Sequence, residues 1–107
     1  MSIAELIATT RERNITEAWN RVLDSADGRL VVWSILERCS LFRQTHWGND
    51  LDGFRAGQRD IGLIVLNERV FPHDVQTFPN MQMEHAALME RIERAAEQEA
   101  EKENPDE

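Results

Sequence analysis

The most apolar stretch of the chain is residues 29–41, RLVVWSILERCSL. Its apolar residues lie on most sides of a helix, which is typical of a helix placed centrally in a fold. Val31, Val32 and Ile35 are β-branched, so a strand is the competing interpretation. We favour a helix because the apolar run continues past the usual length of a strand.

The segment before this stretch also has a helical pattern, with apolar residues spaced three and four apart over residues 3–26. Ser2 and Glu5 have the spacing of a capping box, which would start the helix. Asn14 can cap a second segment, so this region is either one bent helix or two short ones. Asp27 and Gly28 together predict a turn into the central stretch.

Two more helices are expected after the central stretch. Asp50 can cap the third helix and Pro72 ends it, while the last helix begins at Asn80 or at Thr77. The prediction is an all-α fold, a small bundle of about four helices near residues 3–26, 29–41, 50–70 and 80–101. The residues expected in its core are Trp19, Leu23, Val32, Trp33, Leu36, Phe54, Ile61, Val65, Leu88 and Ile92.

Length and charge narrow the range of functions. A chain of 107 residues predicts one small domain, which we place at residues 1–96, followed by an acidic, frayed tail over residues 97–107. The net charge is −8, with 12 basic residues against 20 acidic ones. Such acidity argues against direct nucleic-acid binding and against an anionic membrane surface as partner. The apolar runs are also too short to cross a bilayer.

No residue pattern in the sequence predicts a reaction. The histidines lack the paired helical spacing of a zinc site, and no glycine-rich loop follows a strand. Cys39, the single cysteine, lies at the end of the most apolar helix, where a thiol behaves as a small hydrophobic group. We therefore expect no catalytic residue, no metal and no cofactor; an enzyme would require a reactive Cys39.

Gly53, Gly57 and Gly62 all lie in the third predicted helix, where each costs about 1 kcal/mol relative to alanine. The advantage of glycine inside a helix is close approach of another backbone. Gly53 and Gly57 share one face, bordered by Phe54 and Ile61, so we expect another helix to cross there.

Two arginines on the same predicted helix, Arg55 and Arg59, are four residues apart and have Asp52 and Asp60 nearby. One interpretation is a set of solvated ion pairs worth a few tenths of a kcal/mol. The other is an arginine that reaches a buried carboxylate, such as Glu37, or a partner chain. The sequence leaves both open.

The pattern Phe-x-x-Gly-x-Arg-x-x-Gly, formed by Phe54, Gly57, Arg59 and Gly62, follows an apolar helix that carries a cysteine near its end. Over roughly residues 28–70 the chain resembles the small phage-protein family typified by gene product nineteen of a Bordetella short-tailed phage. The resemblance implies a phage structural or assembly component, located in the virion and assembled in the host cytoplasm. It implies no catalytic residues.

The last predicted helix carries an apolar seam, in which Met81, His85, Leu88 and Ile92 step by four, three and four residues. A seam this short does not hold a coiled coil by itself, so we expect a homo-oligomer that other surfaces also support. The candidate interface is Arg55, Met81, His85, Leu88 and Ile92, and the expected partners are other phage structural proteins or another copy. The alternative is a monomer whose last helix packs within the chain.

A second function class is a small acidic regulator, or a DNA mimic, that binds a host protein. Residues 84–107 hold nine acidic residues against three basic ones, which is the closest approach to a row of carboxylates. These acids crowd one end of the chain, however, and residues 1–60 are near neutral. We therefore favour a helical contact module with a charged tail.

Overall fold

A computed structural model describes residues 1–42 and 47–103 of the chain. Its helices are α1 (Ile3–Asp24), α2 (Ala26–Arg38), α3 (Asp52–Val65), the π-helical turn η1 (Leu66–Val70), α4 (Phe71–His73) and α5 (Thr77–Glu103). No strand occurs in the two described ranges, so the all-α prediction is confirmed. Because α3, η1 and α4 follow one another without a break, the elements form four rods, as predicted.

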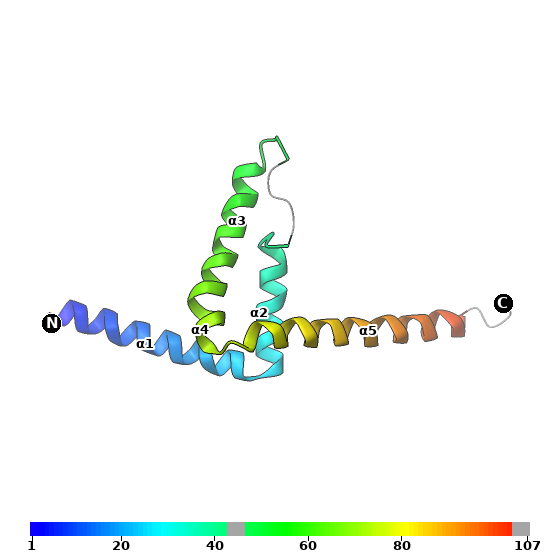
Figure 1. Cartoon of the computed structure of the whole chain (residues 1–107), viewed down its shortest axis with the longest axis horizontal. Coiled ribbons are helices and arrows are strands. Elements are labelled where there is room, and N and C mark those ends of the chain that lie inside the picture. The colour runs from blue at the N-terminus through cyan, green and yellow to red at the C-terminus, as the bar shows by residue number, and fades with distance from the viewer. Residues whose placement is uncertain (43–46, 104–107) are drawn as a thin grey trace.

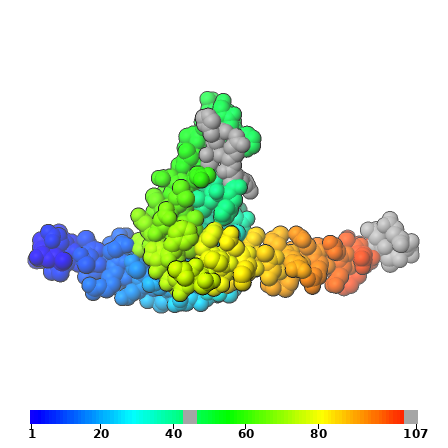
Figure 2. Space-filling view, in the orientation of Figure 1, coloured from blue at the N-terminus to red at the C-terminus, as the bar shows by residue number. Residues whose placement is uncertain are grey.

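The four rods meet at one junction and then diverge (Figure 1). Helices α2 and α3 stand side by side as an antiparallel hairpin, while α1 and α5 leave its base in opposite directions. The space-filling view shows the same three projections (Figure 2). The radius of gyration is 19.5 Å and the long axis measures 75 Å. A compact chain of this length has a radius of gyration of only about 13 Å.

The buried core lies where the rods meet. We call this junction the hub; it comprises Leu23, Val32, Trp33, Leu36, Leu66, Val70 and Met81. Leu23, Val32, Trp33 and Leu36 were predicted as core residues, and the predicted Trp19, Val65 and Leu88 are half-buried.

Three predicted core residues are exposed instead: Phe54 by 65%, Ile61 by 56% and Ile92 by 49%. Phe54 and Ile61 lie on a side of α3 that α2 does not cover, and Ile92 lies where α5 has already left the hub. Their prediction as core residues is therefore wrong, because no side chain of residues 1–42 or 47–103 buries them.

Trp33 is the side chain with the most ring contacts in the hub. Its ring centroid lies 5.5 Å from that of Phe42, 5.9 Å from Phe78 and 5.2 Å from His85. Its indole N–H is buried without a hydrogen-bond partner. Because Phe78 and His85 belong to α5, this ring connects the central helix α2 with the start of the last helix.

The chain turns from α1 into α2 at a single residue, Ser25. Its hydroxyl caps α2 by accepting a hydrogen bond from the Gly28 amide at 2.9 Å. A Cβ atom on Gly28 would lie 1.8 Å from the Val22 carbonyl oxygen, so only glycine fits this approach. The turn predicted at Asp27 and Gly28 is therefore wrong by two residues: both lie inside α2, and Ser25 makes the corner.

The other sequence signals for helix ends hold at two positions and fail at two. Ser2 caps α1 through a 3.1 Å hydrogen bond from the Glu5 amide, as expected. Asn14 begins no second segment, since α1 is one helix. Pro72 does not end the third rod either: it lies in the first turn of α4, where no amide hydrogen is needed. Helix α5 begins at Thr77, the earlier of its two expected starts.

Charged side chains join the rods around the hub. Arg29 of α2 pairs with Glu84 of α5 at 2.9 Å and donates a second hydrogen bond to the Leu23 carbonyl oxygen, also at 2.9 Å. Arg69 of η1 pairs with Glu12 of α1 at 2.9 Å. These partly buried arginines fix the angles at which α1 and α5 leave the hub.

Two histidines make further links between rods. His73 lies between Asp24 Oδ1 and Thr77 Oγ1, each 2.7 Å from a ring nitrogen, and so connects the end of α1 to the start of α5. His85 Nε2 lies 3.3 Å from Glu37 Oε1 of α2.

The close contact between the two helices of the hairpin is at Gly62. A Cβ atom there would lie 2.7 Å from Cys39 Cβ and 2.9 Å from Leu41 Cγ. At Gly53 and Gly57 an added Cβ would meet no atom within 4 Å. The expected helix crossing over Gly53 and Gly57 is therefore wrong for a single chain, because α2 approaches the opposite side of α3.

Substituting alanine at Gly62 and at Gly57 should have opposite effects on stability. We expect Gly62→Ala to lower the free energy of unfolding by about 1–3 kcal/mol, because its methyl group overlaps Cys39. Gly57→Ala, the matched control, should raise it by about 0.5–1 kcal/mol through helix propensity. Urea titrations of the two variants measure both values, and equal effects would contradict the close packing at Gly62.

Candidate protein-contact site at the hairpin tip

The loop that leads into α3 is organised by one carboxylate. Asp52, in the first turn of α3, accepts hydrogen bonds from the backbone amides of Trp47 at 2.8 Å, Gly48 at 2.9 Å and Asn49 at 3.2 Å. Gly48 has a φ of 77°, the left-handed conformation that glycine adopts without strain. The expected cap residue Asp50 makes no capping hydrogen bond, because α3 has Leu51 at its N-cap position.

Arg55 holds the same loop from the next turn of the helix. Its guanidinium donates to Asn49 Oδ1 at 3.1 Å and lies 3.4 Å from Asp52 Oδ1. Within one chain, Arg55 thus makes the local ion pair that was one of its two interpretations. Arg59 is exposed, and Glu37 pairs with His85 rather than with either arginine.

Apolar side chains stand on this tied loop and face solvent. Trp47 is 60% exposed, Leu51 54% and Phe54 65%. Together with Arg38, Ser40, Arg55 and Gln58 they line a groove of ≈580 Å³ at the tip of the hairpin. Tryptophan, phenylalanine and arginine around a shallow groove are the residue types enriched at protein-binding hot spots.

The residues of the sequence motif fall into two groups. Phe54 lies at the tip and Gly57 faces open space on the same helix, whereas Gly62 is buried against α2. Arg59 is exposed between them. Gly62 therefore contributes to packing within the hairpin, whereas Phe54, Gly57 and Arg59 lie on its exposed surface.

The candidate interface drawn from the sequence does not form one site. Arg55 lies near the hairpin tip, while Met81 is buried in the hub at its base. His85 and Leu88 are half-buried against α2, and Ile92 is exposed. The seam therefore begins in the core at Met81 and ends exposed to solvent at Ile92.

Sequence reasoning missed Trp47 and Leu51 as members of the tip. A large aromatic residue next to a glycine in a polar loop was the available signal, since binding residues concentrate on loops held by a rigid scaffold. The hydrogen bonds of Asp52 to three consecutive amides could not be read from spacing alone.

No cluster of three metal-ligating side chains occurs within residues 1–42 and 47–103. None of the helices in these ranges is long and apolar enough to cross a membrane.

Removing the Asp52 carboxylate should loosen the tip without unfolding the hub. We expect Asp52→Ala to expose residues 47–51 to chymotrypsin, because three loop amides lose their acceptor. The associated loss of stability should be about 1–3 kcal/mol. Cleavage after Trp47 or Leu51, mapped by mass spectrometry, is the measurement. Asp60→Ala on the exposed side of α3 is the control; if both variants are cleaved at the wild-type rate, Asp52 does not hold the loop.

The chain is similar to a known protein family. The model of the Bbp19-like phage protein family matches residues 19–82, more than half of the chain. No curated protein and no solved structure matches this chain. The matched segment holds all the hub residues and the α2–α3 hairpin, whereas the first part of α1 and most of α5 lie outside it. The chain belongs to the Bbp19-like phage protein family.

Proposed function

We propose that this phage protein is a non-enzymatic component of the virion or of its assembly pathway, acting through protein–protein contacts. Its place of assembly would be the host cytoplasm. Its partners would be other structural proteins of the particle or further copies of itself.

The observation that carries the proposal is the amount of surface left exposed. The chain exposes 8148 Å², whereas a compact monomer of 12.4 kDa exposes roughly 6,100 Å². The difference of about 2,000 Å² per chain is the area of a large, stable interface. Many large apolar side chains are exposed, among them Ile7, Trp47 and Phe54, and this supports a contact role.

The hairpin tip supplies a preorganised contact within this surface. Because Asp52 and Arg55 tie the loop to α3, Trp47 and Phe54 are already held in place before any partner arrives. Fixing exposed aromatic side chains in advance reduces the entropy lost on binding. This supports docking of the tip into a pocket on a neighbouring particle protein.

The environment of Cys39 supports a role without catalysis. The thiol residue is 8% exposed and lies against Gly62, where a Cβ atom would not fit. Its burial limits the access of a substrate to the sulfur atom.

The acidic residues of α5 support the contact role over a DNA mimic. Glu90, Glu93, Glu97 and Glu101 follow one another at helical spacing on the side of α5 opposite Ile92. A helix with one charged side and one apolar side is typical of a rod that is covered along its apolar side.

The test is mass spectrometry of purified phage particles and assembly intermediates. We expect the wild-type protein in one or both, and a loss of about tenfold or more for Phe54→Ser, since a central aromatic contact contributes about 2 kcal/mol or more. Met83→Ser, at 67% exposure, is matched to Phe54 at 65% and should be incorporated normally.

Absence of the wild-type protein from particles and from every intermediate would contradict the proposal and favour a regulator that binds a host protein. Equal incorporation of both variants would leave the virion role intact but exclude the hairpin tip as its contact.

A further inference from the structure

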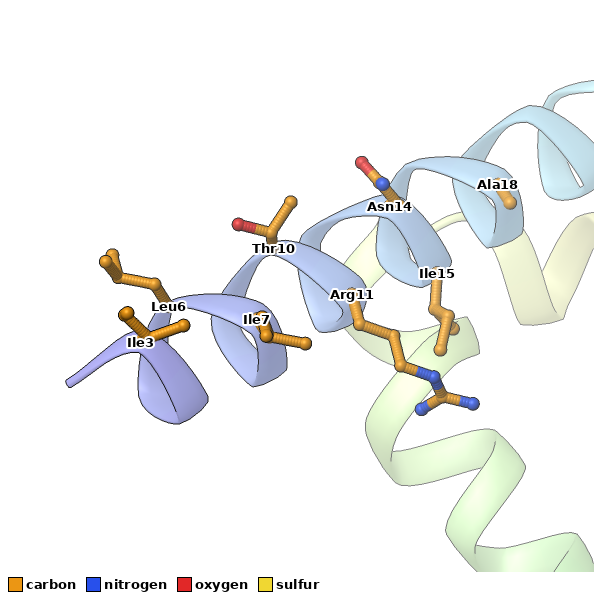
Figure 3. A pocket seen from close by; sticks show the side chains of 8 residues that line it. All are labelled: Ile3, Leu6, Ile7, Thr10, Arg11, Asn14, Ile15 and Ala18. Carbon is orange, nitrogen blue, oxygen red and sulfur yellow. The ribbon is translucent and has the colours of Figure 1, made fainter.

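The first arm of the molecule is residues 3–15 of α1, and its apolar side is exposed. The helix is buried at Leu23 and half-buried at Ile15, but Ile7 is 64% exposed and Ile3 is 78% exposed. Figure 3 shows the side chains that line this hollow of ≈630 Å³, with Arg11 between Ile7 and Ile15. Because Ile7 lies 16 residues before Leu23, it stands on nearly the opposite side of the helix, so this exposed apolar side is distinct from the face that packs in the hub.

The second arm is residues 88–103 of α5, and here the face that packs in the hub does continue outward. Met81 is buried in the hub, Leu88 is half-buried, and Ile92 is 49% exposed one turn further along the same stripe. Met89 widens the stripe and is 38% exposed. Beyond Ile92 the stripe continues with small side chains and ends at Glu99.

The two arms have complementary surfaces when α1 of one copy lies parallel to α5 of another. Because they leave the hub in opposite directions, copies placed in line bring the tip of α1 to the base of α5 in the next copy (Figure 1). This sets the large apolar residues at the tip of α1 against Leu88 and Ile92. It also sets Arg11, which borders Ile7, near Glu99, the acidic residue on the same side of α5 as Ile92.

We infer that the α1 arm of one copy packs along the α5 arm of the next, so that copies join head to tail. The inference rests on the proposed contact role and names one partner, a second copy of this chain. A head-to-tail interface uses two different surfaces on each copy, and it produces a closed ring or an open filament.

Pairing between identical arms is less favourable. Residues 89–103 carry six acidic and three basic residues, so two α5 arms repel each other. Two α1 arms in antiparallel arrangement place Ile3 of one against the polar half of the other, around Arg11. Of these arrangements, the α1–α5 pairing is the one that places apolar residues against apolar residues and a basic residue near an acidic one.

The test uses two variants, each of which lacks one arm surface. Ile7→Asp disables the α1 arm and keeps α5, while Ile92→Asp disables the α5 arm and keeps α1. We expect wild-type protein to assemble in sedimentation velocity, and each variant alone to require about thirtyfold more protein, as for loss of a hot-spot contact. An equimolar mixture should form a heterodimer, because one intact α1–α5 pair remains.

Helical circular dichroism confirms folding of each variant, and Met83→Asp, an exposed position off the stripe, should assemble as wild type does. A monomeric wild type would overturn the inference, as would a mixture that stays monomeric. Dimers of Ile92→Asp alone would show α1–α1 pairing instead, and dimers of Ile7→Asp alone would show α5–α5 pairing. These readouts are independent of particle composition, so this inference can fail while the proposed function stands.

Discussion

Burial of α2 among the other three rods is the constraint on which the rest of the molecule depends. Its residues Val32, Trp33 and Leu36 contribute nearly half of the hub, and Trp33 contacts rings of α5 directly. Arg29 then fixes both arms, through Glu84 on one side and the Leu23 carbonyl on the other. Because the core is confined to this junction, everything beyond it is a projection whose stability depends on its own helix or on a partner.

The fold could be predicted because helix periodicity is a local signal. The four rods, the Ser2 cap and the central place of α2 all follow from spacing within one segment. Periodicity shows which side of a helix is apolar, but it does not show what packs against that side. Phe54 and Ile92 have the spacing of core residues and are exposed, because none of the described helices covers them.

The candidate site was predictable in part for the same reason. Phe54 and Gly57 were singled out by type and spacing, but their neighbour Trp47 belongs to a loop whose shape depends on hydrogen bonds to Asp52. Glycine spacing also predicted a close approach, and the structure places it at Gly62 rather than at Gly57. Which side of a helix a neighbour takes is decided by tertiary packing, here by the position of Cys39 at the end of α2.

The central claim is that a small hub supports two arms which become covered only by a partner. Hydrogen exchange followed over a range of protein concentrations tests it most directly. We predict that backbone amides of residues 3–15 and 88–103 exchange rapidly in dilute solution and gain protection together as concentration rises, while amides around Leu36 stay protected throughout. Arms that are protected equally at every concentration would contradict the account, since they would then be covered within a single chain.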